Sequence, residues 1–143
     1  NQNPNHDWLF TNEGTMIKEG SSDSTVDMPM VNHGMVRIDE GKLTITGDYT
    51  QANGGTLEIP LDGQSKVNRT AILAGTLKIT LPEESDPAAG ETFGIVTASL
   101  AFAMVNSIVW SCPRSQAGRR WPSATHHGGH GFRVGGAVIQ VSL

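Results

Sequence analysis

Apolar and polar residues alternate in short phrases that recur along much of the chain. Each phrase opens with glycine: "GTMIKEG" from Gly14, "GMVRIDEG" from Gly34, "GTLEIPLDG" from Gly55 and "GTLKITLPE" from Gly75. The starts lie 20, 21 and 20 residues apart, and a further phrase, "GIVTAS", begins 19 residues later at Gly94. Alternation with a period of two is typical of a strand buried on one face, and a repeat of about twenty residues is typical of one solenoid turn. The pattern therefore predicts a stacked β-solenoid.

Alignment of the phrases predicts which side chains face the core. The first inward column contains Met16, Val36, Leu57 and Leu77. The second inward column contains Lys18, Ile38, Ile59 and Ile79. Because Lys18 interrupts this apolar column, we expect the first turn to fit poorly, as terminal repeats often do. The outward column between them reads Ile17, Arg37, Glu58 and Lys78. Its alternating charges suit neighbouring parallel strands on a solvent-facing surface.

A second strand is predicted in the other half of each turn, within "STVDMPM", "GKLTITG" and "TAILAG". Its expected inward residues are Val26, Met28, Leu43, Ile45 and Ile72. We therefore predict an all-β fold, a parallel β-helix of about five to six turns. An antiparallel β-sandwich would also explain the alternation, but it gives no reason for such even spacing of the glycine-led strands.

The stretch "KLTITGDYTQANGGTLEIPLDG", with "TAILAGTLKITLPEESDPAAGETFGIVTAS" after it, resembles the passenger-associated β-helix repeat of bacterial autotransporters and related secreted surface proteins. The motif positions are Gly47, Tyr49 and Gln51, then residues 54–57, then residues 75–77, then Gly90, Phe93, Ile95, Thr97 and Ala98. Upstream, residues 10–47 look like the stalk repeats of such proteins.

The resemblance covers residues 10–98. It implies a right-handed parallel β-helix that is secreted or displayed on the bacterial surface, as a stalk, an adhesin or an export-assisting segment. It brings no catalytic residues, and a fold alone supplies none. The chain begins without Met, so we expect it to be part of a larger secreted protein.

The pattern changes after Ser99, which predicts one domain in two parts. Residues 1–99 are expected to form the β-helix rungs, and residues 100–143 an atypical C-terminal cap or loop with a final strand in "GAVIQVSL". In the cap, Ile108, Val109 and Trp110 are expected to cover the open end of the solenoid.

Composition and charge argue against nucleic-acid binding, a membrane span and a disulfide. A net charge of -4 and a pI near 5.6 argue against nucleic acid, although Arg119, Arg120 and Trp121 form a small basic and aromatic run. No apolar stretch is long enough to predict a membrane span. The single cysteine, Cys112, excludes an intramolecular disulfide.

Neither metal binding nor catalysis is expected. His126, His127 and His130 have a spacing that suits two metal ligands, but no carboxylate or cysteine lies close enough in the sequence to complete the site. The acidic residues of the strands and turns, including Asp39, Glu40, Asp48, Glu58 and Asp62, lack the long loops that build a catalytic groove. We therefore expect no enzyme activity, no metal and no cofactor.

The function that the sequence favours is carbohydrate binding. A sugar-binding surface needs an exposed aromatic ring for the apolar face of a pyranose and polar groups for its hydroxyls. Tyr49, flanked by Asp48 and Gln51, fits this description, and Trp110 and Trp121 are further candidate ligand-binding residues. The predicted partner is a polysaccharide. A purely structural stalk or passenger segment remains the alternative.

Overall fold

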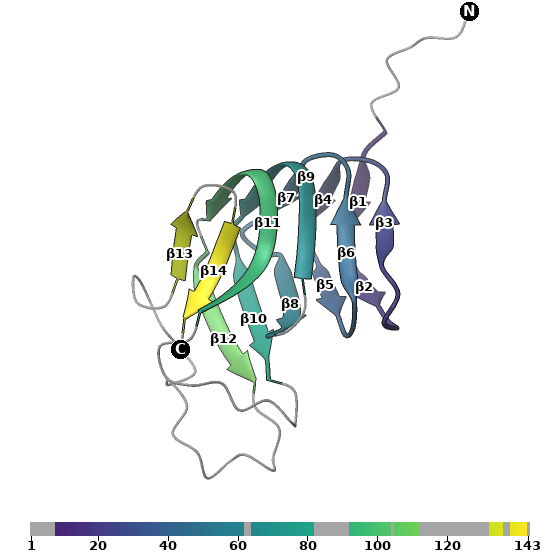
Figure 1. The fold of residues 1–143 in the computed structure, drawn as a ribbon. Coiled ribbons are helices and arrows are strands. Elements are labelled where there is room, and N and C mark those ends of the chain that lie inside the picture. The colour runs from purple at the N-terminus through teal and green to yellow at the C-terminus, as the bar shows by residue number, and fades with distance from the viewer. Residues whose placement is uncertain are drawn as a thin grey trace, which may run out of the picture.

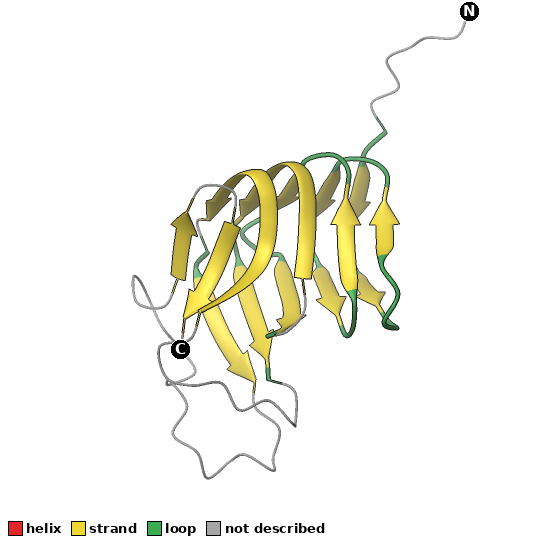
Figure 2. Ribbon diagram, viewed as in Figure 1, coloured by secondary structure: helices red, strands yellow, loops and turns green. Residues whose placement is uncertain are grey.

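The computed structural model describes residues 8–61, 64–81, 92–103, 105–111, 132–135 and 138–142. Every regular element in these residues is a strand (Figure 2). In chain order the strands are β1 (Phe10–Asn12), β2 (Thr15–Lys18), β3 (Ser24–Val26), β4 (Met30–Asn32), β5 (Met35–Ile38), β6 (Lys42–Ile45), β7 (Tyr49–Gln51), β8 (Thr56–Pro60), β9 (Gln64–Leu73), β10 (Thr76–Thr80), β11 (Thr92–Ala103), β12 (Ser107–Ser111), β13 (Phe132–Gly135) and β14 (Val138–Ser142).

The described strands form two sheets that the chain visits in turn (Figure 1). Five strands, in the order β2, β5, β8, β10 and β12, make one sheet, and all of their pairings are parallel. The larger sheet has nine strands, and its pairings are parallel except where β14 pairs with β11 and β13. Parallel pairing of strands one repeat apart confirms the β-solenoid and excludes the antiparallel sandwich.

The number of turns is lower than expected. Three successive groups, β1–β2–β3, β4–β5–β6 and β7–β8–β9, give a solenoid of about three turns, against the five to six predicted. Beyond them the strands lengthen, and β10, β11 and β12 continue the parallel pairing. The chain then ends in the antiparallel strands β13 and β14, so its last part does not add regular rungs.

The predicted register of the smaller sheet is confirmed. Met16 pairs with Val36, Val36 with Leu57, and Leu57 with Leu77. Along the strands, buried and half-buried residues alternate, so Leu57 and Ile59 are buried while Glu58 between them is not. The aliphatic columns of the two sheets form one continuous core. The predicted charge column is also present, because the Lys78 ammonium lies 3.3 Å from the Glu58 carboxylate of the preceding rung.

Lys18 occupies its predicted column without breaking the first turn. It pairs with Ile38 and is buried, with 5% of its surface exposed. Its ammonium group donates hydrogen bonds to the carbonyls of Glu19, Gly20 and Glu40. The aliphatic stem therefore extends the core while the charged group is satisfied at the corner.

The second strand of each turn matches the prediction only in part. Leu43 and Ile45 are fully buried, whereas Val26 and Met28 are half-buried. The prediction for Ile72 is wrong, because it is half-buried and its neighbours Ala71 and Leu73 face the core.

β9 bends between its two inward-facing parts. Ser65 and Val67 point inward, Asn68 and Arg69 are both exposed, and inward residues resume at Ala71. The first part of β9 pairs with β6 and the last part with β7, so the strand turns a corner of the solenoid without interruption. The inward residues on both sides of the bend keep the same alternation, with Arg69 as the one in-phase position that is exposed, so Ile72 was out of phase with them from the start.

The parallel pairing extends beyond the expected boundary at residue 99. β11 runs across it, and β12 pairs in register with β10. Ile108 and Val109 therefore lie in a strand that continues the smaller sheet, rather than in a cap over its end. A final strand within residues 136–143 is present as β14.

Candidate functional site

The prediction that Tyr49 presents an exposed ring is wrong. Tyr49 and Gln51 point into the solenoid, with 3% and 1% of their surfaces exposed. They belong to β7, whose two ends face inward and whose central residue, Thr50, is half-buried. Because neither side chain reaches the surface, neither can stack on or bind a sugar.

These two residues instead form part of an internal polar network at one corner. We call Asn12, Asn32 and Gln51 the amide column, because they pair in register on β1, β4 and β7 and are all buried. The Tyr49 hydroxyl donates to Gln51 Oε1 at 3.1 Å and accepts from Asn32 Nδ2 at 3.4 Å. Burial raises the pKa of the Tyr49 phenol well above its ordinary value. The network therefore holds a neutral phenol and stabilises the corner.

The other predicted site residues are described only in part. Asp48 is exposed at the surface, where its Oδ1 accepts a hydrogen bond from the Thr70 backbone N–H at 3.0 Å. The backbone of Trp110 pairs with Ile79 on β10. Trp121 lies outside the described residues, as do His126, His127 and His130, which are close together in the sequence.

Glu58 on β8 and Asp39, directly after β5, both form ion pairs. Arg37 binds Asp39 through two nitrogens, with Nη2 2.9 Å from Oδ2. The hydrogen bond from Arg37 lowers the pKa of the Asp39 carboxyl. Within the described part of the chain, no three histidine, cysteine or carboxylate side chains lie close enough together to hold a metal ion. No helix in this part is long and apolar enough to cross a membrane.

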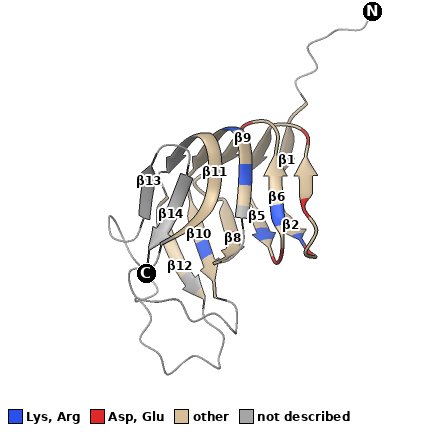
Figure 3. Cartoon of the chain, in the orientation of Figure 1, with Lys and Arg blue, Asp and Glu red and all other residues tan. Residues whose placement is uncertain are grey.

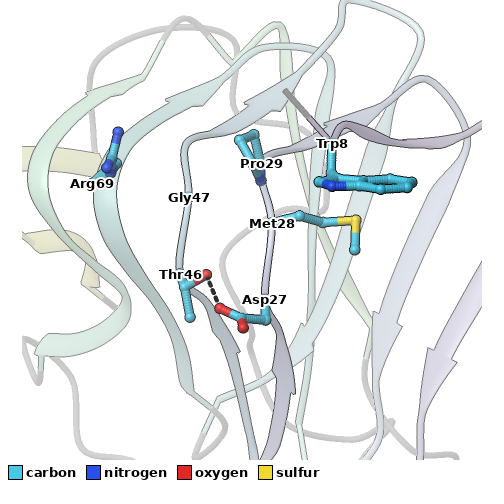
Figure 4. A pocket seen from close by; sticks show the side chains of 7 residues that line it. All are labelled: Trp8, Asp27, Met28, Pro29, Thr46, Gly47 and Arg69. Carbon is cyan, nitrogen blue, oxygen red and sulfur yellow. Dashed lines mark hydrogen bonds between the residues drawn. The ribbon is translucent and has the colours of Figure 1, made fainter. Parts of the chain in front are cut away.

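An open groove lies on the larger sheet, at the corner where three rungs pass side by side (Figure 4). Its volume is about 310 Å³. We call it the Trp8 groove, and its lining residues are Trp8, Asp27, Met28, Pro29, Thr46, Gly47 and Arg69. Asp27 to Pro29 follow β3, Thr46 and Gly47 follow β6, and Arg69 lies at the bend of β9. Each rung therefore contributes a polar side chain to the same surface.

Close packing of the corners makes the floor of the groove. A Cβ on Gly47 would overlap the backbone of Pro29, so only glycine allows the two rungs to approach this closely. Thr46 is tied to the neighbouring corner through its hydroxyl, which donates to Asp27 Oδ1 at 2.8 Å. The Thr46 N–H also donates to the Val26 carbonyl at 3.0 Å, and this bond extends the backbone pairing of β3 with β6. The backbone of the two corners therefore forms the base of the groove, and these contacts hold it in place.

The two sides of the groove differ in chemistry. Trp8 stands on one side, beside Met28 and Pro29, and the indole is strongly exposed at 71%. Arg69 stands on the other side, on the exposed face of β9. Acidic residues gather at the corners beside β3 and β6, and basic residues lie mainly along the strands (Figure 3). The arrangement combines a flat apolar ring, a cation and a hydrogen-bonded carboxylate over a few residues.

Trp8 was not among the site residues predicted from the sequence. Asp27, Thr46 and Arg69 were missed, because each is an ordinary polar residue at a corner or on a strand and they are about twenty residues apart. The usable signal was the repeat itself, since residues one period apart lie side by side in a solenoid.

No protein-family model, curated protein or solved structure gives a significant match to this chain. The resemblance to autotransporter passenger repeats is therefore carried by the motif residues alone.

Proposed function

We propose that this chain is a non-catalytic β-solenoid module that binds polysaccharide in the Trp8 groove. The observation that carries the proposal is the exposed indole of Trp8 beside the polar side chains of Asp27, Thr46 and Arg69. An aromatic ring covers the apolar face of a pyranose, and charged and hydroxyl groups bind its hydroxyls. The volume of about 310 Å³ suits one or two sugar units of a longer chain.

The direction of the groove favours a polymer. Asp27 directly follows β3, Thr46 directly follows β6 and Arg69 lies on β9. These are three neighbouring strands of one sheet, so the groove crosses the rungs. Neighbouring strands are roughly 4.8 Å apart, and an extended glycan lying across them would meet a new polar side chain at each rung. Each contact is weak in water, and affinity in the micromolar to millimolar range is expected.

The carboxylate content of the groove favours binding without cleavage. Asp27 is the one carboxylate among its described lining residues. Glycoside hydrolysis in most families uses two carboxylates facing each other across the bond that breaks. Asp27 is also engaged with the Thr46 hydroxyl, an arrangement that suits a fixed acceptor for a sugar hydroxyl.

A structural stalk is the second candidate function. The observation that favours it is the amide column, where three buried side chains and Tyr49 are used to join rungs rather than to contact a ligand. A module of this kind would show no glycan binding at all. Glycan binding therefore separates the two candidates.

Replacement of Trp8 tests the proposed site directly. In affinity electrophoresis against a polysaccharide that retains the wild-type chain, Trp8→Ala should weaken binding about tenfold, which corresponds to about 1.4 kcal/mol. Ile17→Ala is the matched control, because Ile17 is also an exposed apolar residue, at 45%, but lies on the smaller sheet. Equal retention of both variants with the wild type would contradict the assignment of the groove.

A further inference from the structure

One end of the solenoid consists of strands with an open edge. β1, β2 and β3 are each paired on one side only, with β4, β5 and β6, among the described residues (Figure 1). An open strand edge presents backbone donors and acceptors to any segment that can pair with it. The hydrogen bonds that repeat between the rungs specify what such a segment must provide.

The amide column makes the same bond at each rung. Asn12 Nδ2 donates to the carbonyl of Met35 at 2.9 Å, Asn32 Nδ2 to that of Thr56 at 3.1 Å, and Gln51 Nε2 to that of Thr76 at 3.0 Å. Met35, Thr56 and Thr76 share one register with Thr15, the first residue of β2. The repeat therefore calls for an amide that donates to the Thr15 carbonyl, and no described residue provides it.

The Asn12 side chain also has an acceptor that none of the described residues satisfies. Both of its Nδ2 hydrogens are used, one by Met35 and one by Asn32 Oδ1, which lies 2.9 Å away. Its own Oδ1 accepts no hydrogen bond from the described residues, although only 7% of Asn12 is exposed. Buried side-chain acceptors are almost always satisfied, so this oxygen points to an absent donor in the next position of the column.

Backbone bonds at the corner repeat in the same way. The N–H groups of Met35, Thr56 and Thr76 donate to the carbonyls of Gly14, Gly34 and Gly55, at 2.8 to 2.9 Å. The N–H of Thr15 is the equivalent group in the first rung. The backbone N–H groups of His33, Ala52 and Ala74 likewise donate to the backbone carbonyls of the amide-column residues. The N–H of Glu13 is the equivalent group in the first rung.

Gly14 provides independent support. A Cβ at the equivalent glycines Gly34, Gly55 or Gly75 would overlap a carbonyl of the preceding rung, which makes glycine a steric requirement there. A Cβ at Gly14 would meet nothing within 4 Å, and Gly14 has no positive φ. The first rung therefore carries the glycine that stacking demands at a place where none of the described residues stacks on it.

We propose that this edge binds a partner polypeptide as an additional rung. The partner is a strand–turn–strand segment that runs parallel to β1 and β2 and carries asparagine or glutamine in the amide column. Its amide donates to Asn12 Oδ1 and to the Thr15 carbonyl, and its carbonyls accept from Glu13 and Thr15. A second copy of the chain does not fit: the two Nδ2 hydrogens of its own Asn12 are already used, and at its other end the larger sheet finishes in antiparallel strands.

The test is a titration of the ¹⁵N-labelled chain with a synthetic peptide that repeats residues 28–40, a segment that includes β4, its turn and β5. At about 1 mM peptide, the amide signals of Glu13 and Thr15 should shift and become protected from hydrogen exchange. A peptide with Asn32→Leu should bind at least about tenfold more weakly, because it lacks the amide donor.

Gly14→Ala is the variant that separates binding from folding. Its melting temperature should equal that of the wild type, because the new methyl group meets nothing in the chain, while peptide binding should be lost through overlap with the incoming carbonyl. The proposal is overturned by any of four results: no shift at this peptide concentration, protection of the Thr15 amide in the free chain, equal binding by Gly14→Ala, or sedimentation as a dimer.

Discussion

Glycine and amide side chains determine how closely one rung of the solenoid approaches the next. Gly55 lies beneath the preceding rung, and a Cβ there would be 2.5 Å from the Asn32 carbonyl oxygen. The amide column fills the same corner and satisfies backbone carbonyls that would otherwise be buried without a donor. Close approach and polar satisfaction therefore depend on the same few positions.

Gly55→Ala should destabilise the fold by about 1 to 3 kcal/mol, because the added methyl group forces two rungs apart. Gly54→Ala is the control, since its Cβ would make only an ordinary contact, 3.9 Å from the His33 carbonyl oxygen. It should change the free energy of unfolding by no more than about 0.5 kcal/mol. Urea denaturation of the two variants measures the difference, and similar losses would show that the corner is looser than described.

Tyr49 predicts a dependence of stability on alkaline pH. Its pKa is raised in the folded state by burial, so the unfolded chain loses the phenolic proton at lower pH than the folded chain does. Stability should therefore be complete below the ordinary pKa of 10.0 and fall as pH rises above it.

Comparison with Tyr49→Phe isolates the contribution of the phenol to this pH dependence. The variant should lose about 1 to 3 kcal/mol at neutral pH, because the Gln51 oxygen loses its donor, but its stability should fall less steeply above pH 10. Parallel alkaline profiles for the two proteins would mean that the phenol is not buried as the structure shows.

Strand alternation is the feature of the elements that the sequence predicted best. The columns through β2, β5, β8 and β10 follow directly from the spacing of the glycine-led phrases, because all four strands are straight and bounded by corners. β9 could not be predicted in the same way. It turns a corner within one strand, where Arg69 is exposed although it is in phase with the inward residues Val67 and Ala71. The prediction placed Ile72 inward, but its neighbours Ala71 and Leu73 face the core.

The register can be tested by a pair of neighbouring residues on β8. Ile59→Ala should destabilise the chain by about 2 to 5 kcal/mol, because Ile59 is fully buried and the substitution leaves a cavity. Glu58→Ala removes a half-buried ion pair with Lys78 and should have a much smaller effect, of about 1 kcal/mol or less. Equal losses in thermal denaturation would show that the inward and outward faces had been exchanged.

The candidate site was harder to predict than the fold, for a reason that Tyr49 illustrates. Its turn, with Asp48 and Gln51 nearby, has the composition of a sugar-binding surface, but the side-chain direction of a short strand depends on the corner before it. Here that corner turns Tyr49 and Gln51 inward and leaves Asp48 outside. The Trp8 groove is assembled from separate rungs, so it emerges only when the repeat is folded.

For the molecule as a whole, the two proposed binding surfaces are separate from the residues that hold the rungs together. The core and the amide column join the rungs, the proposed glycan site is the Trp8 groove, and the proposed site of rung addition is the open edge at β1 and β2. The groove and the edge use different atoms, so glycan binding and rung addition can be tested separately.

We propose that the chain binds a polysaccharide without altering it. The most direct measurement incubates the wild-type chain with a panel of soluble and insoluble plant and microbial polysaccharides, and assays both the bound protein and the sugar released into solution. We expect retention on at least one polysaccharide with no release of sugar. Release of sugar, or no retention on any member of the panel, would contradict it.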